Sequence, residues 1–172
     1  MKHVNLNKSN WLLMLFALLL IAPTTLAKVR LPKLVSDKMV LQRDVELNIW
    51  GWASAGEKVT VRFNGAYYET EANSNGEWSV LLPPQKAGGP YLLEVNELKV
   101  RDVLVGDVWL CSGQSNQETP IVRLVDKFPE INVSNNHMIR HYKVPTHEIT
   151  DGVQQEIAGN AVWHSGVASE VL

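Results

Sequence analysis

Two Asn-Gly dipeptides, Asn64-Gly65 and Asn75-Gly76, separate short segments in which apolar and polar residues alternate. Alternation with a period of two is typical of a strand that buries one face, and Asn-Gly is the dipeptide that most favours a two-residue hairpin turn. Val59, Val61 and Phe63 form such an apolar series directly before the first turn. The N-terminal half of the chain is therefore expected to form antiparallel strands rather than helices.

Residues 28–103 are expected to be an all-β unit. Its predicted strands are Val45–Trp52, Lys58–Phe63, Ala66–Ala72, Glu77–Leu82, Tyr91–Val95 and Leu98–Val103. The two Asn-Gly turns are expected to join the second to the third strand and the third to the fourth, and Asn96-Glu97 to join the last two. Trp78 falls on the apolar face of its strand. Short strands with turns at this spacing indicate a small antiparallel β-sandwich.

The apolar run Val103 to Leu110 predicts a buried strand, with Cys111 as a small core residue at its end. It is followed by Ser112-Gly113-Gln114-Ser115-Asn116, whose small polar residues suit a tight turn. A serine presented just past a buried strand is where many hydrolases place their nucleophile, so Ser115 is the candidate catalytic residue. The alternative is that Ser115 and Asn116 only cap the next helix.

After this turn we expect a short helix over Glu118–Phe128, a strand over Met138–Val144 and the start of another strand at Ala161–Trp163. One strand, one helix and one strand cannot bury both faces of a parallel sheet. Residues 104–172 are therefore expected to be the incomplete start of an α/β domain, in a chain that looks truncated.

A serine nucleophile needs a base, usually histidine. The histidines after residue 27 are His137, His141, His147 and His164, and none has an acid three residues before it, the spacing with which several hydrolases hold both partners on one loop. Each is most simply a loop or surface residue. His137 and His141 fall in a predicted loop and strand, so we expect no metal site and no cofactor.

Several neighbours have chemistry that suits a site around Ser115. Gly113 lets the backbone turn sharply, and Gln114 and Asn116 carry amides suited to stabilising an oxyanion. Asp107 lies in the predicted strand before the serine, where it either orients groups near the nucleophile or is a strand-edge acid or a partner for the turn amides.

Three tryptophans of the predicted β unit have flat faces that suit sugar rings. Trp50 and Trp52 share one face of their strand, either to stack on a sugar or to cover the second sheet, whereas Trp78 is more simply a core residue.

Residues 1–27 are expected to be a secretory signal peptide. Lys2, His3 and Lys8 precede an apolar run from Trp11 to Ala22, which is too short for a comfortable membrane span, and Thr25-Leu26-Ala27 offers small residues for cleavage after Ala27. The alternative is an uncleaved anchor. Cleavage predicts a periplasmic or secreted protein with no stable membrane span.

Charge and cysteine usage bound the remaining possibilities. Removing residues 1–27 leaves 14 of the 16 basic residues against all 18 acidic ones, a net charge of −4 with no basic run, so nucleic acid is not an expected partner. A single cysteine excludes an internal disulfide, so stability must come from packing.

Asp102–Asn116 closely resembles the first block of the sialate O-acetylesterases, exported members of the SGNH (GDSL-like) hydrolase superfamily. Ser36–Arg43 resembles the family's opening, as does Asn75-Gly76-Glu77-Trp78 followed by Leu82-Pro83-Pro84. Ile139–Pro145 resembles the strand after the nucleophile helix. The resemblance covers roughly residues 29–164.

The resemblance implies a β-sandwich leading into a flavodoxin-like α/β/α esterase domain, with Ser115 as the nucleophile that removes O-acetyl groups from sialic acid or other acetylated sugars. Gln117 departs from the family, which usually has methionine there. The family's later oxyanion donors and its Asp-x-x-His pair have no counterpart here and would lie beyond Leu172, so the chain as given is expected to be a poor esterase. The alternative is a non-catalytic exported β-sandwich that binds carbohydrate or another partner.

Export is the first testable prediction. Because Thr25-Leu26-Ala27 has the small residues that a signal peptidase requires, mass spectrometry of the protein from its host should find an N-terminus near Lys28. An intact Met1 on a protein from the cytoplasmic fraction would contradict export.

Overall fold

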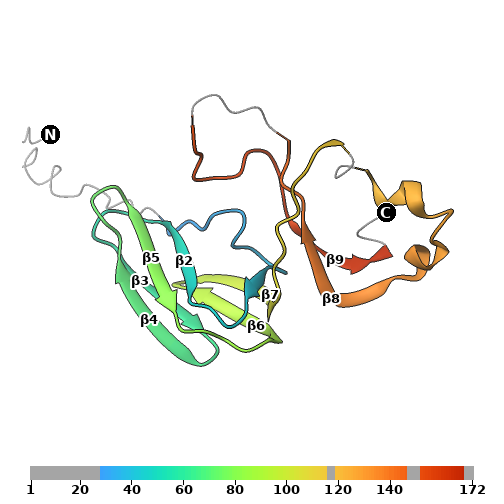
Figure 1. Cartoon of the computed structure of the whole chain (residues 1–172). Helices are drawn as coiled ribbons and strands as arrows, with labels where there is room; N and C mark the ends of the chain where they lie inside the picture. Colours follow the sequence, from blue (N-terminus) through green and yellow to red (C-terminus); the bar gives the residue numbers. More distant parts are fainter. Residues whose placement is uncertain (1–27, 116–118, 147–151, 169–172) are drawn as a thin grey trace, which may run out of the picture.

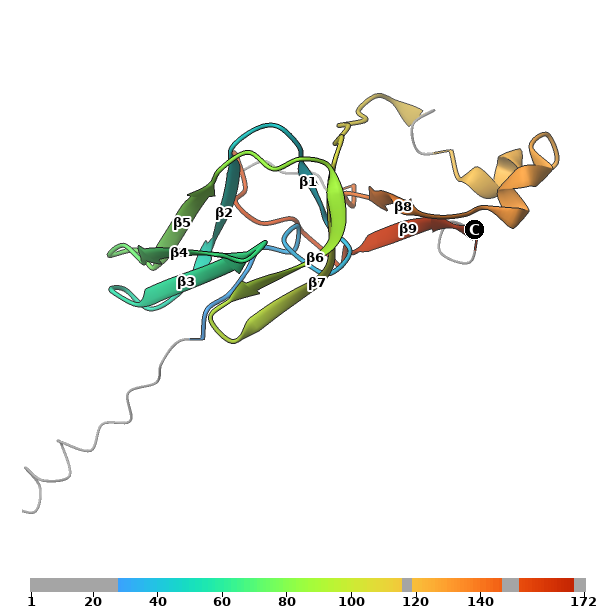
Figure 2. The same cartoon turned by 90° about the horizontal axis from the view of Figure 1, so that it is seen from below.

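The computed structural model describes residues 28–115, 119–146 and 152–168, and its regular structure is almost entirely strands (Figure 1). A curled five-stranded sheet has the order β1-β7-β6-β3-β4. Its members are β1 (Val40–Gln42), β7 (Leu98–Gly106), β6 (Gly88–Val95), β3 (Lys58–Phe63) and β4 (Ala66–Glu71). A separate antiparallel pair consists of β2 (Leu47–Trp52) and β5 (Glu77–Leu82). In Figure 2 this pair lies beside the curled sheet.

The hydrophobic core lies between these two sheets. Leu47, Ile49, Trp78 and Leu82 come from the β2–β5 pair. The five-stranded sheet contributes Val59, Val61, Phe63, Leu93, Val95, Val100, Val103 and Val105. The period-two alternation therefore identified the buried faces correctly, and Trp78 is a core residue as predicted, 4% exposed. Every member of this cluster lies between Val29 and Val105.

Two of the predicted hairpins are confirmed. Asn64 and Gly65 both have positive φ angles, 48° and 80°, as a two-residue turn between β3 and β4 requires. Asn96 turns β6 into β7 with a φ of 49°, and its side-chain oxygen accepts a hydrogen bond from the Thr60 N–H at 2.8 Å. The side chain of Asn96 therefore ties the turn to β3 as well.

The hairpin expected at Asn75-Gly76 is wrong in its pairing. The turn itself is present, with Gly76 at a φ of 77°, but β4 pairs with β3 and β5 pairs with β2. A Cβ on Gly76 would lie 2.6 Å from the Ala53 carbonyl oxygen, so glycine is needed there for the close approach as well as for its φ. The chain crosses from one sheet to the other at this turn, which a local pattern does not reveal.

The interpretation of Val103 to Leu110 as one buried strand is wrong in its second half. β7 ends at Gly106, and the residues after it run extended and exposed, with Trp109 85% and Leu110 93% accessible. Cys111 is also exposed and is not the core residue that was predicted. The strand ends where its pairing partner ends, because β1 stops at Gln42 opposite Gly106.

Beyond residue 118, the predicted helix is reduced to the short 3-10 helix η2 (Ile121–Leu124), with Glu118 itself outside the described residues. A second 3-10 helix, η3 (Pro129–Val133), follows. The two predicted strands appear as β8 (Asn135–Tyr142) and β9 (Trp163–Val167), which pair antiparallel. No helix in the described part of the chain is long and apolar enough to cross a membrane.

A bulge in β7 connects this hairpin to the five-stranded sheet. Leu93 pairs with Val100 and Tyr91 with Val103, so two residues of β7 stand opposite one of β6, and Asp102 takes a φ of 57°. The carboxylate of Asp102 accepts two hydrogen bonds of 2.9 Å from Nη2 of Arg140 on β8. The side chain of Arg140 is 3% exposed, so this ion pair lies at a largely buried junction.

Further contacts hold the C-terminal segment against residues 30–34. The Lys33 Nζ donates to the carbonyl oxygens of Ile157 and Gly159 at 2.7 and 2.6 Å. The Trp163 indole N–H donates to the Leu34 carbonyl oxygen at 2.9 Å. The long loop before β9 therefore docks on the N-terminal segment rather than forming a layer of its own.

Replacing Asp102 by asparagine should lower the free energy of unfolding. Asparagine keeps the size and the tolerance for positive φ, but it leaves the buried guanidinium of Arg140 without a counter-charge. Losing one partner of a fully buried pair costs about 3–5 kcal/mol, and because Asp102 is 39% exposed we expect about 1–3 kcal/mol. Urea denaturation followed by circular dichroism measures this change in the free energy of unfolding.

Lys86→Gln is the matched control, since Lys86 pairs with Asp44 but is almost fully exposed. It should change stability by no more than about 0.5 kcal/mol. Equal effects of the two substitutions would contradict a structural role for the Asp102–Arg140 pair.

Candidate functional site

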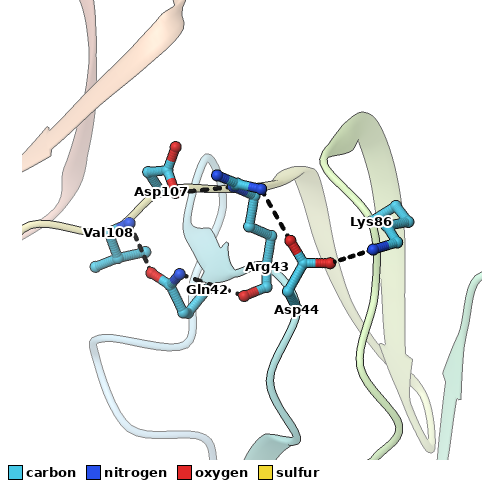
Figure 3. A network of polar contacts seen from close by, with 6 residues as sticks. All are labelled: Gln42, Arg43, Asp44, Lys86, Asp107 and Val108. Atoms are coloured by element: carbon cyan, nitrogen blue, oxygen red, sulfur yellow. Dashed lines mark hydrogen bonds and ion pairs between the residues drawn. The ribbon is translucent and has the colours of Figure 1, made fainter.

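A chain of polar contacts fixes the direction of the backbone as it leaves β7 (Figure 3). The Arg43 Nε donates to the Asp107 carboxylate at 2.8 Å, and its Nη1 donates to Asp44 at the same distance. Lys86 closes the series with a 2.6 Å hydrogen bond to the other oxygen of Asp44. Arg43 thus joins the exit of β7 to the segment after β1, and Lys86 joins that segment to the loop before β6.

The charges in this series support one another. The hydrogen bond to Asp107 raises the pKa of the Arg43 guanidinium, and the hydrogen bond from Lys86 lowers the pKa of the Asp44 carboxyl. Both groups therefore remain ionised at neutral pH. Among the described residues, Asp107 pairs with Arg43 rather than with the turn amides that were one alternative from the sequence.

Val108 is held by one further bond, because its backbone N–H donates to the side-chain oxygen of Gln42 at 2.8 Å. Gln42, Arg43 and Asp44 follow the apolar residues of β1 as a polar run, and this run and Asp107 were the sequence signals for the network. Within the described ranges, these hydrogen bonds restrain Asp107 and Val108. Residues 109–115 continue as an exposed stretch.

Ser115 lies at the far end of this stretch and is exposed, as are Gly113 and Gln114. Asn116 lies outside the described residues. Gly113, Gln114 and Ser115 are consecutive residues of this stretch. No hydrogen bond joins the Ser115 hydroxyl to a side chain in the ranges 28–115, 119–146 and 152–168. The candidate nucleophile is accessible to a substrate.

The histidines lie on the β8–β9 hairpin or beyond the described ranges. His141 on β8 pairs in register with His164 on β9, and their rings stack with centroids 5.0 Å apart and planes 17° from parallel. His137 is exposed near the start of β8, and His147 is outside the described residues. Within the described ranges, none of them forms a hydrogen bond with Ser115.

In the described part of the chain, no group of three or more His, Cys, Asp or Glu side chains is arranged to hold a metal ion. Arg140 was not among the residues predicted from the sequence. Arg140 pairs with Asp102 because the bulge in β7 places the Asp102 carboxylate beside β8. A bulge of this kind cannot be seen in the alternation of apolar and polar residues.

The chain was compared with known protein families and with curated proteins. The chain matches no family model. It is 30% identical over 150 residues to the sialate O-acetylesterase of Homo sapiens, a match that covers 78% of this chain and 29% of that protein. The sialate O-acetylesterase of Rattus norvegicus is 32% identical over 117 residues, which cover 59% of this chain and 22% of the relative. The chain thus spans less than a third of the length of the curated relatives it matches.

A solved structure supports the same relationship. The crystal structure of a carbohydrate acetylesterase from Xanthomonas citri superimposes with a TM-score of 0.79 at 38% sequence identity. The match covers 84% of this chain and 34% of that chain.

Because Cys111 is exposed in the stretch leading to Ser115, a thiol reagent such as dithionitrobenzoate should modify one thiol per folded chain. The rate should be close to that of the denatured chain, since no packing protects the sulfur. Cys111→Ser should abolish the reaction. Slow modification that requires urea would show that the stretch is buried and that the strand continues past Gly106.

Proposed function

Because the chain belongs to the sialate O-acetylesterase family, we propose that it contributes to a carbohydrate esterase that removes O-acetyl groups from sialic acid or other acetylated sugars. The observation that carries the proposal is the pair of matches, to curated sialate O-acetylesterases and to a solved carbohydrate acetylesterase. The substrate class follows from what those relatives act on.

The proposed nucleophile is Ser115. Its Oγ attacks the acetyl carbonyl carbon, its proton passes to a base, and the sugar oxygen takes that proton as the C–O bond breaks. Water then adds to the acetyl-enzyme and releases acetate. The exposure of Ser115 and the glycine two residues before it support this role, since both allow close approach of an ester.

Gln114, Asn116 and the backbone N–H of Ser115 are the proposed donors to the oxyanion. A donor aimed at the developing negative charge is worth about 10²–10³ in turnover. The base is proposed to be a histidine held near Ser115 in the active enzyme. Because no described histidine bonds to Ser115, the isolated chain is proposed to turn over esters very poorly.

The proposal extends to location and architecture. We assign residues 1–27 to a signal peptide that directs the protein to the periplasm or outside the cell. Residues 28–103 are assigned to a β-sandwich domain, which the core shared by the two sheets supports. Residues 104–172 are assigned to the start of an SGNH-type α/β/α esterase domain, on the strength of the similarity to sialate O-acetylesterases.

A chimera tests the nucleophile. In the chimera, residues 28–168 replace the matching segment of the Xanthomonas citri carbohydrate acetylesterase. The rest of the chimera is the remainder of that related enzyme. The chimera should hydrolyse 4-nitrophenyl acetate, and Ser115→Ala should lower turnover by about 10⁶-fold, the loss expected when a serine nucleophile is removed. Ser112→Ala, three residues earlier in the same exposed stretch, is the matched control and should leave most of the activity.

The 172-residue chain alone should hydrolyse the ester at the background rate, with no change in Ser115→Ala. Turnover by this chain that is lost in Ser115→Ala and in alanine variants of His137, His141, His147 or His164 would show that the base is already present. A folded chimera whose activity survives Ser115→Ala would overturn the assignment of the nucleophile. A folded but inactive chimera would favour a non-catalytic binding module.

A further inference from the structure

A groove of about 700 Å³ lies along the β2–β5 pair. The strand register places Trp50 of β2 opposite Ser79 of β5, and Trp52 opposite Glu77. Gln154 and Gln155 line the groove from the loop that precedes β9. Indole faces, a hydroxyl, a carboxylate and two amides therefore converge on one open space, at residues that the esterase proposal does not use.

The loop segment that carries Gln154 and Gln155 is held in place by an ion pair and a hydrogen bond of the next residue, Glu156. The guanidinium of Arg30 stacks over the Trp52 ring at 3.6 Å and forms a 3.1 Å ion pair with Glu156. The other carboxylate oxygen of Glu156 accepts a hydrogen bond from the Lys33 backbone N–H at 3.2 Å. Because Glu156 directly follows Gln155, these bonds fix the position of the glutamine backbone before any ligand arrives.

A core residue forms another part of the lining. Trp78 packs against the backbone of Gly51, where an added Cβ would lie 2.8 Å from the indole ring and 2.3 Å from the Arg30 carbonyl oxygen. The Trp78 indole N–H is buried and has no hydrogen-bond partner among the described residues. Because this N–H is buried, a ligand in the groove does not reach it, and Trp78 serves the site by packing under the backbone of β2 at Gly51.

We propose that this groove binds a neutral oligosaccharide. Pyranose rings present flat C–H faces that suit the partly exposed ring of Trp50, and their hydroxyl groups match amides and carboxylates as hydrogen-bond partners. The volume lies within the range of small-molecule sites, about 300–1,000 Å³.

The charge of the lining selects the class of sugar. Glu71 and Glu77 both line the groove, and among the described residues that line it there is no lysine or arginine. The charge of Arg30, which stacks on Trp52, is paired with Glu156. Two carboxylates repel a sugar acid such as sialic acid, whereas they accept hydrogen bonds from the hydroxyls of a neutral sugar. The site is separate from Ser115 and does not depend on the proposed esterase chemistry.

Binding is tested with the full chain carrying Ser115→Ala, so that ester hydrolysis plays no part. A printed array of neutral hexose and pentose oligosaccharides, together with sialyllactose, identifies the ligand, and titration calorimetry measures its Kd. At least one neutral oligosaccharide should bind, and sialyllactose should bind at least about tenfold more weakly.

Ser79→Arg places a long side chain in the groove from an exposed strand position and should weaken binding of the neutral sugar by about tenfold or more. Trp50→Ala should do the same by removing a stacking face, with thermal melting to confirm that each variant folds. Tyr67→Ala is the matched control, because Tyr67 is an exposed aromatic residue of β4 outside the groove, and it should leave the Kd unchanged.

Absence of binding to every neutral oligosaccharide of the array would overturn the proposal. So would binding that survives Ser79→Arg in a folded protein, or a preference for sialyllactose. None of these results would bear on Ser115, whose role the chimera tests separately.

Discussion

The ion pair between Asp102 and Arg140 is the interaction on which the arrangement of the chain depends. It exists because β7 carries one extra residue relative to β6, which turns Asp102 into the left-handed region and places its carboxylate beside β8. An arginine side chain that is 3% exposed is tolerated only with such a partner, since an unpaired buried charge is strongly unfavourable. The hairpin of β8 and β9 is thereby attached to the sheet that holds most of the core.

Two segments next to this junction carry the two proposed sites: the stretch from β7 to Ser115 and the loop before β9. The exit of β7 is held by Arg43 and Gln42 and then runs exposed to Ser115, where the proposed nucleophile is accessible. The loop before β9 is held by Arg30 and Lys33 and brings two glutamines to the tryptophans of β2. If both proposals hold, one chain would carry a reacting serine and a separate surface for a neutral sugar.

Local signals predicted the strands well and their partners less well. Lys58–Phe63 and Glu77–Leu82 match β3 and β5 residue for residue, because alternation and Asn-Gly turns act over a few neighbouring residues. The pairing of β5 with β2, and the parallel pairing of β1 with β7, join segments far apart in the chain. No turn residue or periodicity encodes such a pairing, because packing between the two sheets selects it.

The sequence by itself determined the buried faces, the turns at Asn64-Gly65 and Asn96, and the family to which the chain belongs, since each depends on residue identity or local spacing. Only the tertiary structure decided that the apolar run leaves the sheet at Gly106, so that Trp109 and Cys111 are exposed. Hydrophobicity favours burial, but a strand continues only while a partner supplies hydrogen bonds to its backbone. β1 ends opposite Gly106, and the strand ends with it.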